Sequence, residues 1–366
     1  MPTLPMSDKN GNIIAPHIVI LGAGASIALT KEDKELYYNE LPSMNNLVEK
    51  VGLEGLLDTY NIDYKDKNFE ILFEELSLNP ELTALTKQIE DEIYKYFYTM
   101  KLPDKLTMYD YLIMSLTSND VIATFNWDPF LIQALARCSR YTHELPRLIH
   151  LHGNVGIGVC YEDSVVGHKD AKCGTCHKNF EPTTLLYPIG KKDYASNPLI
   201  KDEWDTLKRY MEFAYYITIF GYSAPISDLE AKKLLLDVWV ENRTMELAQI
   251  EIIDIVSSDE LSERWADFIF NFHYGTNKDI FDSYLFRFPR RSCSALFQAL
   301  MMLQPRAENP FPKFETLEEL WMWIKSLIEE EKNEEAFLFQ VLENNNDTNI
   351  EAVNEYEKHK NSNLPK

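Results

Sequence analysis

The sequence predicts an α/β fold with a doubly wound, Rossmann-like and mostly parallel sheet. Short apolar runs with strand character lie at 17–21, 121–125, 148–151, 216–220 and 250–255. Helical patterns separate most of them, at 129–138, 198–214, 225–240 and 261–270. Strands that alternate with helices form parallel sheets, and nearly continuous apolar runs indicate strands covered on both faces.

The segments between the strands suggest how the chain is divided. We expect residues 1–30 and 119–290 to form the main domain, with a Cys-containing loop module at 153–190. Residues 31–118 carry mostly helical spacings, which is too much helix for a single crossover, so we expect a helical insertion subdomain. Beyond a short strand at 284–288, we expect a C-terminal helical region at 291–343 and a flexible, acidic tail at 344–366.

Composition excludes several classes of protein. The chain has 366 residues and a formal net charge of -22, with 58 acidic and 36 basic residues, which argues against a nucleic-acid-binding surface. No apolar run approaches the roughly 20 residues that span a bilayer. The first residues lack the basic and then apolar pattern of a secretion signal. A cytoplasmic protein with no membrane contact is therefore the expectation.

A glycine-rich turn follows the first predicted strand. It consists of Gly22, Ala23, Gly24, Ala25 and Ser26. Glycines let a backbone approach a phosphate, and the start of the following helix would supply N–H donors and partial positive charge. The third glycine of the G-x-G-x-x-G fingerprint falls on Ile27, so the turn alone is also compatible with a simple tight turn.

Polar residues follow two further strands. Asn126 and Asp128 come directly after 121–125, where the Asn could hold a ribose hydroxyl or a water and the Asp could instead cap the helix that begins near Pro129. His152 ends the run 148–151 and is suited to accept a proton near neutral pH. We interpret Asn126 and His152 as the candidate catalytic pair. His150, two residues earlier, is better explained as a buried structural histidine.

A second loop of the same kind follows the run 216–220. Gly221, Tyr222 and Ser223 could contact a phosphate or ribose, and Asp254 stands near the end of the next strand, where it could accept ribose hydroxyl protons. An ordinary loop carboxylate is nearly as good an explanation for Asp254.

These motifs, in this order, resemble the sirtuin-like NAD-consuming superfamily, and most of all the sirtuin-like domains of bacterial anti-phage defence proteins. Gly22-Ala-Gly-Ala-Ser26 matches the Gly-Ala-Gly-x-Ser loop of that family, and Phe125-Asn126-Trp-Asp128 matches its Thr-Asn-Tyr-Asp-like motif. His152-Gly153 matches its catalytic pair, and Gly221-Tyr-Ser223 with Asp228 matches its second nucleotide loop. The resemblance covers residues 18–257.

The resemblance implies an enzyme that cleaves NAD between nicotinamide and ribose, with Asn126 holding the ribose or a water and His152 acting as general base. Protein deacylases of the family carry Gly-Ile-Pro-x-Phe-Arg after the glycine loop. Here Ile27-Ala-Leu-Thr-Lys-Glu-Asp-Lys has no Pro, Phe or Arg, so water becomes the favoured nucleophile. Hydrolysis of NAD to nicotinamide and ADP-ribose is therefore the leading hypothesis. Protein deacylation, ADP-ribosyl transfer and a non-catalytic subunit that senses NAD or ADP-ribose are the alternatives.

Two further expectations follow from the resemblance. Family members often hold structural zinc with two C-x-x-C pairs. Here Cys173 and Cys176 form one pair while Cys160 stands alone, so zinc would need a fourth ligand from Asp163, His168 or His177, and free thiols are the alternative. Uncontrolled loss of NAD would kill the cell that makes the enzyme. We therefore expect gating by homo-oligomerisation or by a protein partner encoded nearby.

Overall fold

The computed structural model describes residues 15–31, 41–187, 194, 196–224, 229–240, 248–269, 273–300 and 306–344. The chain divides into two compact units, residues 1–315 and 316–366. The region 291–343, expected as one piece, therefore spans both units. Within the described residues, no helix has the length and apolar character needed to cross a membrane.

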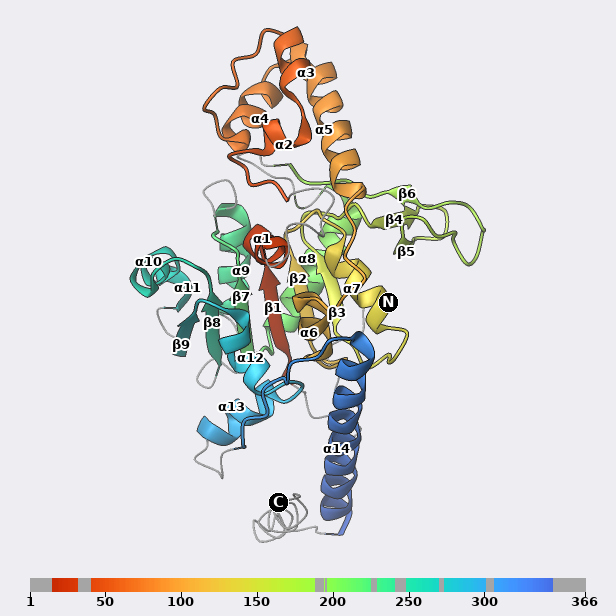
Figure 1. The fold of residues 1–366 in the computed structure, drawn as a ribbon, viewed down its shortest axis with the longest axis vertical. Helices are drawn as coiled ribbons and strands as arrows, with labels where there is room; N and C mark the ends of the chain where they lie inside the picture. The colour runs from red at the N-terminus through yellow and green to blue at the C-terminus, as the bar shows by residue number, and fades with distance from the viewer. Residues whose placement is uncertain are drawn as a thin grey trace. The chain divides into compact units, whose positions relative to one another are not determined.

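A six-stranded, fully parallel sheet forms the centre of the first unit (Figure 1). The strand order is β3-β2-β1-β7-β8-β9. The strands are β1 (His17–Leu21), β2 (Val121–Thr124), β3 (Arg147–His150), β7 (Tyr216–Phe220), β8 (Gln249–Ile253) and β9 (His273–Asn277). This confirms the predicted doubly wound fold. The chain builds outward from β1 on one side and then returns beside it through β7, so the topological switch point lies between β1 and β7.

Helices cover the two faces of the sheet because the strands are apolar on both sides. All five residues of β1 and of β7 are buried. The covering helices are α1 (Ala23–Lys31), α6 (Met108–Met114), α7 (Phe130–Cys138), α8 (Pro198–Met211), α9 (Leu229–Trp239), α10 (Ser258–Arg264), α11 (Ala266–Ile269), α12 (Tyr284–Arg287) and α13 (Ser292–Leu300). Helix α8 illustrates the local signals. Asn197 caps the N–H groups of Leu199 and Ile200, and Pro198 occupies the first helical position.

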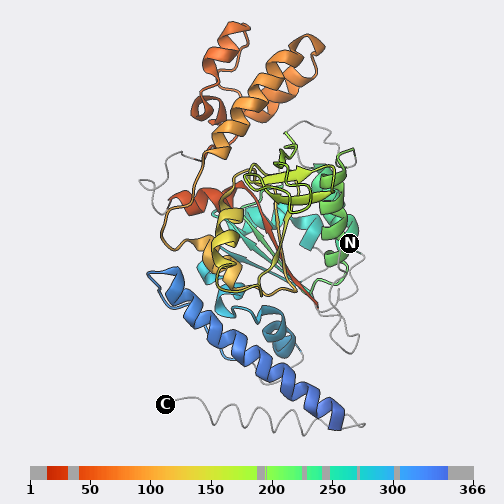
Figure 2. The same ribbon diagram turned by 90° about the vertical axis from the view of Figure 1, so that its right-hand side faces the viewer.

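The segment expected as a helical insertion stands over the carboxyl ends of the strands (Figure 2). It contains α2 (Leu47–Val51), α3 (Glu54–Thr59), α4 (Phe69–Ser77), a 3-10 turn η2 (Pro80–Leu82) and α5 (Thr83–Tyr98). Its helices bury one face each, as α4 does through Phe69, Leu72, Phe73 and Leu76. Residues 47–59 form two helices and not one, because Gly52 adopts the left-handed conformation (φ 79°) and ends α2.

A second, small sheet follows β3. Its strands are β4 (Ile157–Cys160), β5 (Val165–His168) and β6 (Glu181–Pro182), paired antiparallel in the order β5-β4-β6. Gly158 and Gly167 lie against Phe180. A Cβ added at Gly158 would come within 2.4 Å of the Phe180 Cβ, and one added at Gly167 would come within 2.8 Å of the Phe180 ring. This sheet occupies the segment expected as the Cys-containing loop module.

The structure differs from the sequence-based prediction near the end of the sheet. The segment 284–288, predicted as a short strand, is helix α12, because Ser283 caps it by accepting from the Phe286 N–H. The last strand, β9, was not predicted. Its residues are half-buried or exposed and include Gly275 and polar side chains, so this edge strand lacks an apolar signal.

The second unit contains helix α14 (Leu317–Asn344), followed by residues that lie outside the described ones. Helix α14 lies within the region expected to be helical at 291–343 and continues to the point where the tail was expected to begin. The expectation of a flexible tail at 344–366 falls, apart from Asn344, outside the described residues.

Candidate active site

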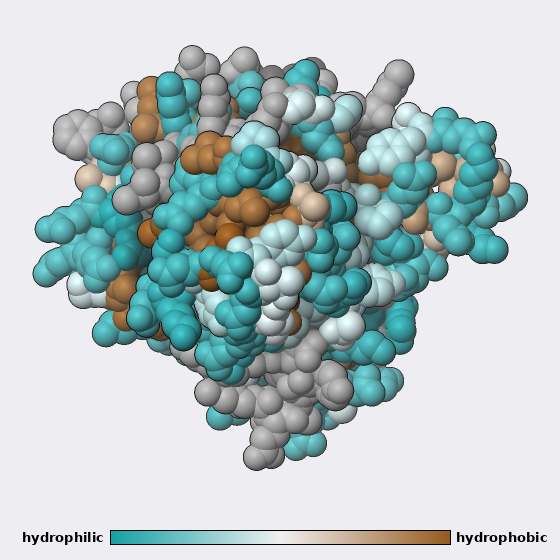
Figure 3. Space-filling view, turned by 90° about the horizontal axis from the view of Figure 1, so that it is seen from above, coloured by the Kyte–Doolittle hydropathy of each residue, from teal (hydrophilic) through white to brown (hydrophobic). Residues whose placement is uncertain are grey.

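A cavity of about 470 Å³ opens at the carboxyl ends of the strands, beside the switch point. Its size lies within the range of ligand-binding pockets, roughly 300 to 1,000 Å³. Seen from the side of the insertion, apolar side chains gather at the centre of this face inside a polar rim (Figure 3). The predicted site residues that line the cavity are Ala23, Gly24, Asn126, Asp128, His152, Gly221, Tyr222, Ser223 and Asp254.

The glycine loop packs against the second loop. The Gly24 N–H donates to the Gly221 carbonyl oxygen at 2.9 Å, and the Ala25 N–H donates to the Gly22 carbonyl oxygen at 3.0 Å. A Cβ added at Gly22 would come within 2.5 Å of the Gly221 carbonyl oxygen. The glycines therefore permit the two loops to touch. Two N–H groups that the sequence suggested for a phosphate are used within the protein, so a phosphate would have to rely on the remaining donors and on the field of α1.

Three of the predicted loop residues do not line the cavity. Gly22, Ala25 and Ser26 lie behind its wall, and Ser26 is fully buried. The Ser26 hydroxyl contacts the Tyr109 hydroxyl at 2.7 Å and accepts a hydrogen bond from Asn126. Ser26 thus supports the site from behind and does not face a ligand in this conformation.

Asn126 is held by two hydrogen bonds from its amide nitrogen. Nδ2 donates to the Gly22 carbonyl oxygen at 2.9 Å and to the Ser26 hydroxyl at 3.0 Å. Both amide hydrogens are thereby used, which fixes the orientation of the side chain. The amide oxygen remains the part of Asn126 that can accept a hydrogen bond from a ribose hydroxyl or a water.

Asp128 combines a capping role with a place in the cavity wall. Its Oδ1 accepts from the Phe130 N–H at 3.2 Å, as the capping interpretation predicted. Burial raises the pKa of the Asp128 carboxyl to about 6, although the Ser26 hydroxyl and the Phe130 N–H act in the opposite direction. A carboxyl with this pKa can hold or release a proton close to neutral pH.

His152 lies in a column of rings that crosses the site. Tyr222 stacks on Phe125 with centroids 4.1 Å apart, and Phe125 meets the His152 ring edge-on at 4.8 Å. On its far side, His152 Nε2 contacts the Tyr194 hydroxyl at 3.1 Å. Both His152 and Tyr194 are buried. The ring is therefore oriented by packing against Phe125 and by its hydrogen bond with Tyr194.

Gly153 lets the chain turn away directly after His152. Its φ is 76°, and an added Cβ would come within 2.2 Å of the Thr184 carbonyl oxygen. His150, by contrast, does not line the cavity. It is buried, its N–H donates to Glu203 Oε2 at 3.2 Å, and burial lowers the pKa of its ring to about 4. This placement agrees with the interpretation of His150 as a structural residue.

The second glycine loop, Gly221 to Ser223, forms another part of the cavity wall. Gly221 has a φ of 63°, Tyr222 is buried within the ring column, and Ser223 is exposed at the rim. Asp254 also lines the cavity, and its Oδ1 accepts from the Val256 N–H at 3.4 Å. Asp228, which belonged to the second-loop motif, lies outside the described residues.

Sequence reasoning missed every residue that the helical insertion contributes. The cavity is also lined by Leu41, Pro42, Met44, Leu47, Asn68, Glu70 and Phe97. Tyr194 and Arg264 were missed as well. These residues stand in no recognisable motif and come from distant parts of the chain, so no pattern in the sequence connected them with Asn126 or His152.

The cysteines predicted as metal ligands come together with one carboxylate. Cys160, Asp163, Cys173 and Cys176 offer ligand atoms that all lie within 4.8 Å of one another. Cys160 Sγ is 3.4 Å from Cys176 Sγ, and Cys173 Sγ is 3.1 Å from Asp163 Oδ2. Three thiolates and a carboxylate form a set that suits tetrahedral zinc. Of the three candidates for the fourth ligand, the structure brings Asp163 into place.

Comparisons with known proteins give only a likeness of fold. No family model and no curated protein matches the chain. A solved complex of a Sir2 homologue with NAD is similar at 17% identity, covering 78% of this chain and 90% of that one, with a TM-score of 0.37. A Sir2 homologue mutant bound to ADP-ribose is similar at 13% identity, covering 79% and 94%, with a TM-score of 0.34. Likeness at this level does not extend to activity, so the chemistry of this chain rests on its own residues.

Proposed function

We propose that this protein is an NAD glycohydrolase, which cleaves NAD to nicotinamide and ADP-ribose. The observation that carries the proposal is that Asn126 and His152, from different strands, line one cavity at the switch point of the sheet. In open parallel sheets this crevice is where nucleotides bind. The motifs that line it are also those whose order resembles the sirtuin-like superfamily.

The proposed reaction breaks the bond between the ribose C1′ and the nicotinamide nitrogen. The electron pair leaves with nicotinamide, whose ring becomes neutral, and positive charge develops on the ribose. The oxygen of water then bonds to C1′, and His152 accepts the proton that water loses. Asn126, with its amide orientation fixed from behind, positions the ribose or the water. Buried side chains around the cleaved bond limit access of bulk water.

Hydrolysis is favoured over protein deacylation by a feature of the sequence. The segment after the glycine loop lacks the Pro, Phe and Arg with which deacylases of the superfamily shield the reactive carbon. Dependence of nicotinamide release on an added acylated peptide or acceptor would favour deacylation or ADP-ribosyl transfer. Binding of NAD without turnover under any condition would favour a sensing subunit.

A role in anti-phage abortive defence is the biological part of the proposal. An enzyme that empties the cell of NAD has to stay inactive until infection. We propose gating by a protein partner encoded nearby or by homo-oligomerisation, with the insertion as one contact surface because it forms part of the cavity wall.

Zinc is proposed as a structural ion. Cys160, Asp163, Cys173 and Cys176 would hold it, and it would stabilise the small antiparallel sheet that follows His152. The cluster takes no part in the proposed reaction.

The test is to purify the chain with and without its genomic neighbours and to follow NAD and its products by mass spectrometry. We expect nicotinamide and ADP-ribose in equal amounts from at least one preparation, and a loss of at least about 100-fold in rate for Asn126→Ala and for His152→Ala, as for other positioned catalytic groups. Full turnover by the His152 variant, in a preparation whose wild type is active, would remove the general-base assignment.

A further inference from the structure

Glu70 is a carboxylate that the helical insertion presents to the cavity. It stands in the first turn of α4, where its N–H donates to the side chain of Asn68 at 2.8 Å. The adjacent Phe69 is buried, and its N–H donates to the Met44 carbonyl oxygen at 2.8 Å. The backbone at the start of α4 is therefore anchored directly before the Glu70 side chain.

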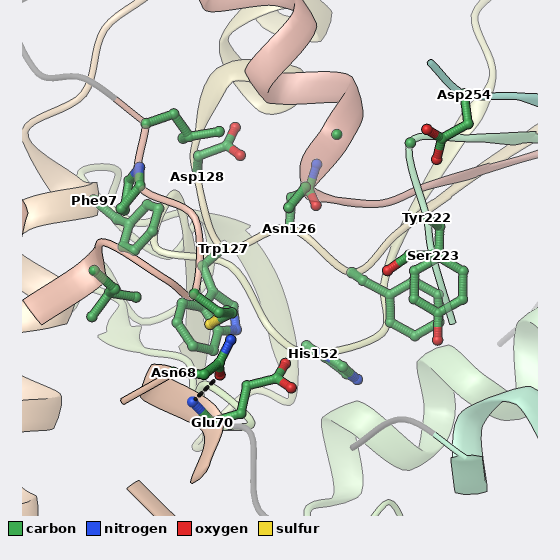
Figure 4. A pocket seen from close by; sticks show the side chains of 18 of the residues that line it. Asn68, Glu70, Phe97, Asn126, Trp127, Asp128, His152, Tyr222, Ser223 and Asp254 are labelled. Atoms are coloured by element: carbon green, nitrogen blue, oxygen red, sulfur yellow. Dashed lines mark hydrogen bonds between the residues drawn. The ribbon is translucent and has the colours of Figure 1, made fainter. Parts of the chain in front are cut away.

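The carboxylate of Glu70 is directed into the cavity on the side where His152 lies (Figure 4). Its charge reaches across the site. Burial is the main cause of the raised pKa of Tyr222, and the charges of Tyr194 and Glu70 add to it. Asp254 and the second glycine loop lie toward the other end of the cavity in the same view. Glu70 therefore faces the part of the cavity where His152 lies.

The same end of the cavity holds an unused hydrogen-bond donor. Trp127 Nε1 is buried, and it has no hydrogen-bond partner among the residues that the structure describes. Trp127 lines the cavity next to Phe97, whose ring it meets edge-on at 5.7 Å. A buried donor without a partner costs free energy unless a ligand or water accepts from it. Because Trp127 Nε1 is not exposed to the cavity, a ligand there would meet the Trp127 ring and the Glu70 carboxylate. These surroundings suit a flat ring that carries a positive charge.

We infer that Glu70 is the charge partner of the oxidised nicotinamide end of NAD, and that it makes the site selective for the cationic NAD+ over the neutral-ringed NADH. The inference rests on the proposed function and names the group that recognises the reacting end of the substrate. The carboxylate would also stabilise the positive charge that moves from the nicotinamide ring to the ribose as the bond breaks. The helical insertion would then contribute directly to substrate recognition.

The test compares NAD+ with NADH as ligands by calorimetric titration, with hydrolysis products monitored by mass spectrometry. The chains compared are wild type, Glu70→Gln, Glu70→Asp and, as a matched control, Glu74→Gln, which removes one charge from the exposed side of the same helix. We expect wild type to prefer NAD+ by about 10-fold or more, as one opposite charge a few ångströms away in a partly buried site would give. Glu70→Gln should lose that preference through weaker NAD+ binding, with NADH binding unchanged.

The variants separate the possible outcomes. Glu70→Asp keeps the charge and should retain part of the preference, and Glu74→Gln should behave as wild type. An unchanged preference in Glu70→Gln, in a protein that binds NAD+, overturns the role of Glu70 but leaves the proposed function standing. A wild type that binds neither dinucleotide overturns the proposed function and this inference with it. Circular dichroism confirms folding, and the charge-retaining Asp variant distinguishes lost charge from lost structure.

Discussion

The two ends of the central sheet each bury a histidine, but only one of them has the form of a reactive site. At the amino end, His17 is fully buried, with Nδ1 2.7 Å from the Ser292 hydroxyl and Nε2 2.8 Å from the Thr218 hydroxyl. At the carboxyl end, His152 is almost as deeply buried, yet it lines a cavity. The difference shows that burial of a titratable group is not enough for chemistry. The group also needs space beside it for a ligand.

Topology explains why the cavity lies where it does. At the carboxyl end the chain leaves β1 and β7 in different directions, and the cavity lies beside this switch point, lined by residues of both glycine loops. At the amino end the His17 N–H donates to Asp120 Oδ1 at 2.8 Å and the rings of His17 and Tyr216 meet at 4.6 Å. The backbone N–H and both ring nitrogens of His17 have partners inside the protein, so His17 contributes to stability and has no room for a ligand beside it.

Of all the changes proposed, removing metal from the Cys cluster should cause the largest loss of stability. The loss should be confined to the part of the molecule at the carboxyl end of the sheet. Structural zinc sites contribute on the order of 10 kcal/mol of binding free energy at neutral pH. Chelation, or Cys176→Ser, should open residues 157–182 to hydrogen exchange and leave the strands around His17 protected. The matched measurement is metal content of protein purified without added zinc, where we expect one zinc per chain. Absence of metal together with unchanged exchange would contradict the structural role.

His17→Ala should destabilise the protein by about 4 kcal/mol, because it leaves a cavity and two buried hydroxyls without their partner. His152→Ala should cost less, since its ring already borders open space. Denaturant titration of both variants makes the comparison, and an equal loss would contradict it.

The pH dependence of the His17 variant sharpens this contrast. Burial lowers the pKa of His17 from 6.5 to about 3, so the folded state binds fewer protons than the unfolded state between these values. The stability that comes from neutral His17 is fully present above pH 6.5 and is lost as pH falls toward 3, by about 1.4 kcal/mol per pH unit. The difference between wild type and variant should therefore shrink on acidification.

Asp128→Asn should stabilise the protein by about 2 kcal/mol above pH 6 and have little effect below pH 4. The folded pKa of about 6 lies above the ordinary value of 3.8, so the folded state holds the proton more tightly. The stability that comes from the protonated Asp128 carboxyl is present at low pH and is lost as pH rises through 6. Asn keeps an acceptor for the Phe130 N–H. Asp237→Asn, at an exposed position of α9, is the control and should show no such crossover in thermal melts at pH 4 and pH 8.

Tyr194→Phe should give the smallest effect, about a 10-fold fall in kcat with KM nearly unchanged. A His152 that acts as base through Nδ1 donates its Nε2–H to the Tyr194 hydroxyl, and the protonated ring donates there more strongly than the neutral ring. Loss of that acceptor should leave the imidazolium that forms during the reaction less stable, so the loss should appear in kcat. An unchanged kcat would indicate that Tyr194 only fills space.

Patterns in the amino-acid sequence were enough to predict the central sheet and the residues at its carboxyl edge. Apolar strands buried on both faces, glycines where two loops touch, and polar residues at strand ends are local requirements, so they leave local patterns. For that reason we could predict five of the six strands of the central sheet. We could also predict that Asn126, His152 and the loop at Gly221 lie at its carboxyl edge. Strand β9 could not, because an exposed edge strand needs no apolar run.

The residues that surround the cavity could be identified only from the folded chain. Glu70, Phe97 and Tyr194 come from segments far from the motifs, and their place beside His152 depends on how the insertion and the loop after β6 pack. The fourth residue of the Cys cluster, Asp163, was one of three candidates until the antiparallel sheet brought it to the thiols. Contacts between distant segments depend on packing in three dimensions, and such packing imposes no fixed spacing on the sequence.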